Sequence, residues 1–180
     1  MLTRRAALKT TAGMAVTSAL AGCLGTGGGE GVSFHRNTKR PISSTTRFDA
    51  ARFAGRWTIR GEMVHPGDVP TFGSVVFHAS GAGISGLEIH AMKRGGEGLL
   101  ERYDTTQPAP GRIVVGRAPF DTQYWVLWVD DDYRTAAIGT PSGSFGWIID
   151  RERSGGEDRV KAARDVLAFN GYDMSRLETR

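Results

Sequence analysis

Hydrophobic and polar residues alternate in short runs along most of the chain, which is the pattern of half-buried β-strands. The clearest run places Trp57, Ile59, Gly61 and Met63 on one side and Thr58, Arg60 and Glu62 on the other. Further apolar runs follow at close spacing, separated by segments rich in Gly, Pro and Asp, which favour turns. The predicted strands cover residues 57–64, 72–79, 86–92, 98–103, 112–116, 123–129, 134–140 and 144–151.

These strands predict an all-β fold. Eight strands joined by short loops suit an antiparallel up-and-down barrel, because closing the sheet removes its exposed edges and leaves room for one small ligand. The number of strands does not exclude an open sandwich, which is the competing all-β architecture.

Two helices are predicted around the strands. Asp49 can cap a single turn over 50–53, after which Gly55 lets the chain swing into the first strand. The residues 154–157 resemble a capping box that begins a second helix, and Gly171 ends it. One stripe of this helix carries Val160, Ala163, Leu167 and Asn170, with Val166 at its margin, so we expect this mostly apolar side to pack on the outside of the barrel.

The N-terminus has the features of an export signal. Arg4, Arg5 and Lys9 precede a mildly apolar stretch, 12–21, that is too short to cross a bilayer of about 30 Å. We interpret residues 1–22 as a lipoprotein signal peptide of twin-arginine type, with a general secretory route as the alternative.

A lipid anchor is predicted directly after that signal. The residues 20–23 resemble a lipobox, which makes Cys23, the only cysteine, the lipidated first residue of the mature chain. The segment 23–46 is rich in Gly, Ser and Thr and is predicted to be a flexible tether, followed by one folded domain over 47–180. The expected location is the cell envelope, and the outer membrane if the source is Gram-negative.

The charge balance argues against a nucleic-acid partner. The chain of 180 residues carries 23 basic and 19 acidic residues, a formal net charge of +4. Three of the basic residues lie in the signal segment, which leaves 20 basic against 19 acidic residues in the remainder. Phosphate recognition needs a concentrated basic face, which this composition does not offer.

Three motifs, taken together, resemble those of the lipocalins. Gly55-Arg56-Trp57 is similar to the first lipocalin motif, 129–133 to the second and 147–151 to the third, and they occur in the family's order. The similarity covers Phe48 to about Leu177 and is strongest to bacterial outer-membrane lipocalins and the apolipoprotein D group, whose bacterial members share the lipobox. The resemblance assigns structural roles to Gly55, Trp57, Asp130, Tyr133 and Arg151.

The resemblance also implies a function. Lipocalins bind small hydrophobic molecules in the calyx of the barrel, so we expect a membrane-tethered carrier of a lipid or fatty acid, without enzymatic activity and without a cofactor. The region 66–120 is shorter than its counterparts and rich in glycine, which predicts short middle strands and leaves the depth of the calyx open.

Strand parity predicts where the ligand binds. Arg151 shares parity with Phe145, Trp147 and Ile149, so it should stack on Trp57 at the base of the barrel. The ligand site is then expected at the opposite end, where Met63 and His65 would meet Phe145 and Trp147. The predicted ligand-binding residues are Met63, Phe145, Trp147, Ile59, Phe77 and Tyr124.

Other chemistry is weakly indicated. His65, His78 and His90 have no partner at a metal-ligand spacing, and Glu62, Glu88, Glu101 and Asp104 are more typical of solvated strand faces than of a catalytic pair. No metal site and no catalytic residue is therefore predicted. Two alternatives stay open: a haem- or cofactor-dependent enzyme, and an envelope protein-interaction module around a filled barrel.

Overall fold

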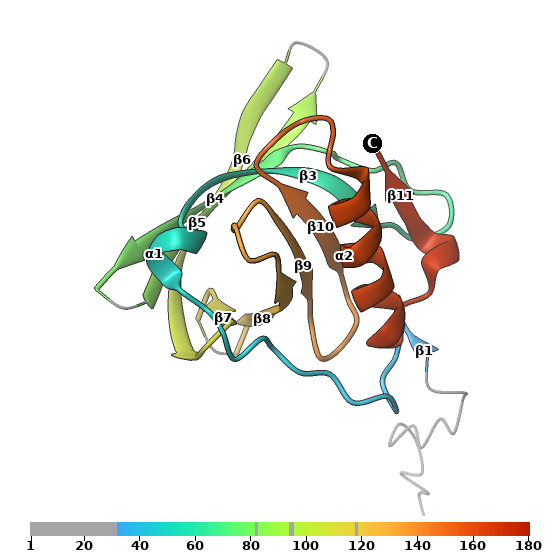
Figure 1. Cartoon of the computed structure of the whole chain (residues 1–180), viewed down its shortest axis with the longest axis horizontal. Helices are drawn as coiled ribbons and strands as arrows, with labels where there is room; N and C mark the ends of the chain where they lie inside the picture. The colour runs from blue at the N-terminus through green and yellow to red at the C-terminus, as the bar shows by residue number, and fades with distance from the viewer. Residues whose placement is uncertain (1–31, 82, 94–95, 118) are drawn as a thin grey trace, which may run out of the picture.

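The computed structural model describes residues 32–81, 83–93, 96–117 and 119–180 (Figure 1). The predicted signal peptide and Cys23 lie outside these ranges. Within them, no helix is both long enough and apolar enough to cross a membrane.

Eight strands form a closed antiparallel barrel. They are β3 (Gly55–Met63), β4 (Ser74–Ser80), β5 (Gly83–Lys93), β6 (Gly96–Ala109), β7 (Arg112–Val115), β8 (Thr122–Val129), β9 (Thr135–Gly139) and β10 (Gly146–Asp150). Each strand pairs with the next along the chain, and β10 pairs back with β3. This closure confirms the predicted up-and-down barrel and excludes the open sandwich.

The two ends of the barrel are defined by its connections. The β4–β5, β6–β7 and β8–β9 turns lie at one end, which we call the base, together with helix α1 (Ala50–Phe53). At the other end, which we call the mouth, β3, β5, β7 and β9 end and β4, β6, β8 and β10 begin.

Two of the middle strands, β5 and β6, are long, so the prediction of short middle strands was wrong for them, whereas β7 has only 4 residues. β5 has 11 residues and β6 has 14, more than any other strand in the described part of the chain. Gly86 keeps its place in the ladder, opposite His78 on one side and Asp104 on the other. A glycine inside a strand costs only about 0.5–1 kcal/mol, which continuous pairing on both sides outweighs.

The base is closed by the predicted stack. The Arg151 guanidinium lies 3.7 Å from the centroid of the Trp57 ring, and the Trp57 indole donates to the carbonyl of Phe53 at 2.8 Å. Arg151 also donates to the backbone carbonyls of Arg52, Phe53, Ala54, Arg56 and Tyr133. As predicted, the Asp49 side chain caps α1 by accepting from Arg52 N.

Helix α2 (Glu157–Phe169) packs outside the barrel on β8, β9 and β10, as predicted (Figure 1). Ala163 and Leu167 are fully buried in this contact. The capping-box prediction was wrong, because the N-cap residue is Gly156, in a left-handed conformation, and no side chain in the described part of the chain caps the helix. Gly155 and Gly156 both have positive φ, so they carry the chain into the helix without a serine cap.

The N-terminal segment 32–46, predicted as part of a flexible tether, lies against the barrel. It contains the two-residue strands β1 (Val32–Ser33) and β2 (Arg36–Asn37). The Arg36 side chain is buried and donates to the carbonyls of Arg40, Pro141 and Asn170. Further along, Thr45 N donates to Val126 O at 2.8 Å. The segment is held by hydrogen bonds to distant backbone groups, which its composition does not reveal.

The chain ends beside the barrel. The 3-10 helix η1 (Met174–Arg176) leads into β11 (Leu177–Thr179), which pairs with the last residues of β3.

Candidate functional site

The interior of the barrel is filled over its lower part. Side chains from several strands around Trp57 are only 0 to 2% exposed: Ile59, Phe77, Ile113, Val126, Ile138 and Ile149. A void next to these side chains that was large enough for a water molecule would leave part of their surface exposed. The interior therefore offers no open space next to them, and a calyx that reaches the base is absent from the described structure.

Three aromatic side chains form a cluster at the mouth end of the interior. Tyr124 comes from β8, Phe145 from the β9–β10 connection and Trp147 from β10. The ring centroids of Tyr124 and Phe145 are 4.2 Å apart, those of Phe145 and Trp147 are 5.2 Å apart, and Tyr124 meets Trp147 edge to face at 5.6 Å. We call these residues the mouth aromatic cluster.

The mouth aromatic cluster is less enclosed than the core below it. Tyr124 and Trp147 keep 8% and 7% of their surface, and Phe145 is half-buried. Ile89 of β5 and Tyr103 of β6 are also half-buried against the same core. Ile89 has the same strand parity as Leu87, so alternation along the sequence could have identified it as an inward-facing residue. Tyr103 is the last residue of the predicted strand 98–103, and alternation does not assign a direction to a terminal residue.

The Tyr124 hydroxyl is one of two polar groups in the cluster, and the indole N–H of Trp147 is the other. Burial, together with the nearby Glu101 carboxylate, raises the pKa of Tyr124 to about 12. The hydroxyl therefore stays protonated at neutral pH and can donate a hydrogen bond. The cluster combines an apolar aromatic surface with a neutral donor, which suits a ligand that is mostly hydrocarbon with one polar end.

Met63 does not face the interior, so its predicted position beside Trp147 was wrong. The β3–β10 register pairs Ile149 with Ile59 but Trp147 with Glu62, with a bulge between Ile148 and Ile149. A bulge changes the face to which later residues point. Met63 consequently packs in the outer cluster under α2, with Ile148, Tyr172 and Leu177.

The other predicted ligand-binding residues fall into two groups. Tyr124, Phe145 and Trp147 are brought together, but Ile59 and Phe77 lie deep in the sealed core, where Phe77 packs on Phe53 with ring centroids 4.9 Å apart. His65 is exposed outside the barrel, and its ring stacks on His35 at 4.4 Å. Of the predicted ligand-binding residues, Tyr124, Phe145 and Trp147 are the ones that meet at the less enclosed mouth end of the described interior.

The residues of the second motif hold the base together. Both Arg134 N and Thr135 N donate to Asp130 Oδ1 at 2.6 Å. Tyr133 has a φ of 59°, a strained value for a residue with a side chain, and its hydroxyl accepts from Asp49 N at 2.7 Å. These contacts join the β8–β9 turn to the segment before α1.

A polar cluster lies on the outer face of β4, β5 and β6. The Glu88 carboxylate contacts His78 Nε2 at 3.2 Å, His90 Nε2 at 3.3 Å and Arg102 Nη2 at 2.8 Å. Partial burial opposes ionisation of Glu88, but the hydrogen bonds and the Arg102 charge outweigh it and lower its pKa. Among the described residues, no group of three or more His, Cys, Asp or Glu is placed to hold a metal ion.

Sequence comparison finds similarity in the C-terminal part of the chain. Residues 111–180 match the family model described as a lipocalin-like domain. Temperature-induced lipocalin-1 of Arabidopsis thaliana is 41% identical over 59 residues, which are 33% of this chain. The match covers 32% of the plant protein, so the chain spans about a third of the length of that curated relative.

Structural comparison extends the similarity to most of the barrel. Lipocalin 12 from rat epididymis has a TM-score of 0.61 at 11% identity, covering 82% of this chain and 91% of that chain. Insecticyanin from the tobacco hornworm Manduca sexta has a TM-score of 0.59 at 15% identity, covering 78% of this chain and 84% of that chain. At these identities the comparison establishes a shared fold, and the fold is that of the lipocalins.

Proposed function

We propose that this chain is a member of the lipocalin family that binds a small hydrophobic or amphipathic molecule at the mouth aromatic cluster. The observation that carries the proposal is the meeting of Tyr124, Phe145 and Trp147 at the mouth end of the interior, where the side chains are less enclosed than in the core below. The family model over 111–180 and the three motifs support the family assignment.

A lipid or fatty acid is the ligand class that fits best. Aromatic rings offer apolar area, and the Tyr124 hydroxyl offers one donor for a polar end. The filled lower barrel leaves only the mouth for the ligand, so part of an acyl chain stays outside. A ligand that buries about 300 Å² of apolar surface gains roughly 7 kcal/mol before the entropic losses of association, so binding is expected to be no tighter than micromolar.

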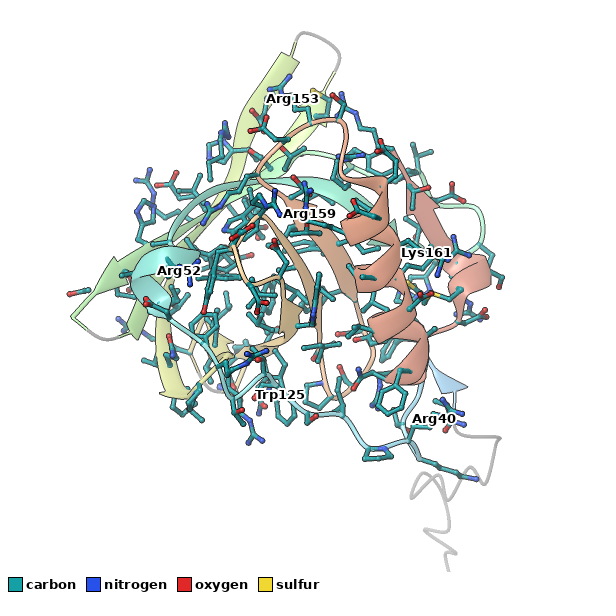
Figure 2. The ribbon with its side chains drawn as sticks, in the orientation of Figure 1. Arg40, Arg52, Trp125, Arg153, Arg159 and Lys161 are labelled. Atoms are coloured by element: carbon teal, nitrogen blue, oxygen red, sulfur yellow. The ribbon has the colours of Figure 1, made fainter. Side chains whose placement is uncertain are left out.

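Tryptophan fluorescence tests the proposal. Titration with a fatty acid or lysolipid should quench or shift the emission, and Trp147→Ala should remove most of that signal and weaken binding while the protein stays folded. Trp125 is the matched control, because it lies on the outer face of β8 beside Arg112 (Figure 2). Trp125→Ala should therefore bind as the parent does. Unchanged binding by Trp147→Ala would overturn the site.

We also propose that Cys23 carries a lipid anchor that holds the domain in the cell envelope, in the outer membrane if the source is Gram-negative. The support is the sequence: an arginine-containing signal segment followed by a lipobox. Because a lipidated cysteine is the acceptor of the acyl groups, Cys23→Ser should abolish both the added acyl mass and the removal of residues 1–22. Mass spectrometry of the protein from its own membrane measures both, and processing that continues in the variant would refute the anchor.

The filled lower barrel favours one other function, an envelope protein-interaction module. A barrel with fully buried interior side chains can act as a rigid scaffold for its outer surface. Absence of binding to any fatty acid or lysolipid at micromolar concentration in the titration above would favour this alternative.

A further inference from the structure

Large exposed hydrophobic side chains gather at one end of the molecule. In the described ranges they are Phe34, Val69, Phe120 and Phe169, with 50%, 87%, 90% and 81% of their surfaces exposed. Single exposed hydrophobic residues are ordinary on a protein surface, so their number alone means little. Their common location carries the argument.

Two of these side chains lie on connections that form the mouth. Val69 belongs to the β3–β4 connection and Phe120 to the β7–β8 connection, and both connections join strands at that end. Neither is on a base turn, and no large hydrophobic side chain at the base of the described structure is exposed.

The other two lie at the same end outside the barrel. β10 runs from the mouth to the base, so α2, which follows it, returns to the mouth, where Phe169 is its last residue. The Phe34 ring is 6.1 Å from His65 of the β3–β4 connection, and the adjacent His35 N donates to Gly143 O of the β9–β10 connection. All four side chains therefore border the mouth.

The N-terminal part of the chain joins the domain at this end as well. Val32 is the first residue that the structure describes, and it begins β1, which lies next to the C-terminal end of α2 (Figure 1). The 31 preceding residues include Cys23. With the proposed lipid anchor at Cys23, nine positions of chain would separate the anchored residue from Val32 beside the mouth.

We propose that the mouth of the barrel docks on a lipid bilayer, with Phe34, Val69, Phe120 and Phe169 inserted into the interfacial region. Separate apolar side chains around a rim fit a fluid surface, whereas a protein partner needs a contiguous complementary patch. The surrounding charges have both signs, with Lys39, Arg40 and Arg117 against Asp68 and Asp121. Docking is therefore driven by apolar contact and should depend little on ionic strength or on anionic lipid.

Docking would give the mouth aromatic cluster direct access to the membrane. Tyr124, Phe145 and Trp147 would then face the bilayer, and a lipid could pass between membrane and protein without crossing water. This consequence rests on the proposed ligand binding, but the docking itself does not.

Single fluorescent labels test the orientation. Cys23 is the only cysteine, so Cys23→Ser gives a full chain into which one cysteine can be introduced at a chosen position. Val69→Cys and Phe120→Cys report on the rim, and Ser80→Cys, exposed at the end of β4 at the base, is the matched control. Each variant carries an environment-sensitive dye and is mixed with phosphatidylcholine vesicles.

Both rim labels should shift to the blue and gain about twofold in intensity on the vesicles, as expected for entry into the interface, while the Ser80 label stays unchanged. The result should be the same at low and high salt. The unprocessed N-terminus is common to all variants, so it cannot produce a difference between them. Equal shifts at all three positions, no shift at the rim, or a rim shift that appears without vesicles through self-association would each overturn the proposal.

A further variant separates docking from ligand binding. Trp147→Ala in the same labelled chains removes the proposed ligand contact but leaves the four rim side chains. The rim labels should respond to vesicles as before. Loss of fatty-acid binding with retained rim shifts would place the defect in the ligand site, and loss of the rim shifts in this variant would show that docking is not a property of the rim.

Discussion

At the scale of single residues, the stack of Arg151 on Trp57 is the contact that closes the base. The Trp57 indole is fully buried, and the Arg151 guanidinium donates to five backbone carbonyls in and next to α1, in β3 and in the β8–β9 turn. A planar guanidinium can satisfy several acceptors at once while its face rests on the ring. Removing either partner therefore disturbs the same set of contacts.

Trp57→Ala is expected to lower the free energy of unfolding by about 3–5 kcal/mol, the range for a large buried aromatic residue. Arg151→Ala should cost less, and the two losses should not add, because the side chains are in contact. Urea unfolding of both single variants and the double variant measures the coupling. Strictly additive losses would mean that the stack contributes nothing.

His35 makes stability depend on pH. The pKa of His35 is lowered to about 4, mainly because the ring is buried. The nearby His65 and Arg176 lower this pKa further, while Asp173 acts to raise it. The Nδ1 of His35 is buried and has no hydrogen-bond partner among the residues that the structure describes. Between pH 6.5 and about 4 the unfolded chain binds a proton here that the folded chain does not, so stability falls as pH decreases through this window.

Replacement of His35 tests this dependence. His35→Gln removes the titrating ring, so the decline of the unfolding free energy between pH 7 and pH 4 should become shallower than in the parent. An unchanged pH profile in His35→Gln would rule out the assignment.

At the scale of secondary-structure elements, the bulge in the β3–β10 pair decides which side chains reach the interior. Without it, Met63 would lie beside Trp147, as strict alternation predicts. With it, Met63 stabilises the contact of the barrel with Tyr172, Leu177 and the α2 layer. The proposed ligand site is correspondingly smaller, with Tyr124 from β8, Phe145 from the β9–β10 connection and Trp147 from β10.

Met63→Ala should therefore affect stability but not binding. We expect a loss of about 2–5 kcal/mol, as for other buried methionines, with fatty-acid affinity equal to that of the parent. Unfolding in urea and the tryptophan titration measure the two effects separately. A variant that loses affinity at full stability would place Met63 in the pocket after all.

At the scale of the whole molecule, the segment 32–46 ties the mouth to the outer helix. The Arg36 guanidinium connects the β9–β10 connection, through Pro141 O, to the end of α2, through Asn170 O. Three backbone acceptors depend on this one side chain, since it also donates to Arg40 O. The segment is therefore part of the folded domain.

Arg36→Ala should loosen that segment without unfolding the barrel, because the lost donors leave buried carbonyls unpaired. Limited proteolysis within 32–46 should become at least several times faster, while the far-ultraviolet spectrum stays unchanged. Lys39→Ala, at an exposed neighbour, is the control and should be cleaved at the parental rate. Equal cleavage of both variants and the parent would show that Arg36 does not hold the segment.

The sequence by itself determined the strands, the barrel, the outer helix and the stack at the base. These features depend on local alternation, on turn residues and on the parity of β10 near Arg151, all of which act over a few neighbouring positions. The glycine content of β5 and β6 led to a wrong prediction of their length. The conformational cost of a single glycine in a strand is small, and pairing with the neighbouring strands outweighs it.

Three features were decided only by the tertiary structure: the side of the sheet to which Met63 points, the hydrogen bonds of Arg36 and the depth of the space inside the barrel. The bulge arises from the register between two strands that are about 90 positions apart in the chain, and Arg36 finds its acceptors more than 100 positions away. The interior is filled because side chains from all around the barrel meet once it closes, and their summed volume is not visible in any local pattern.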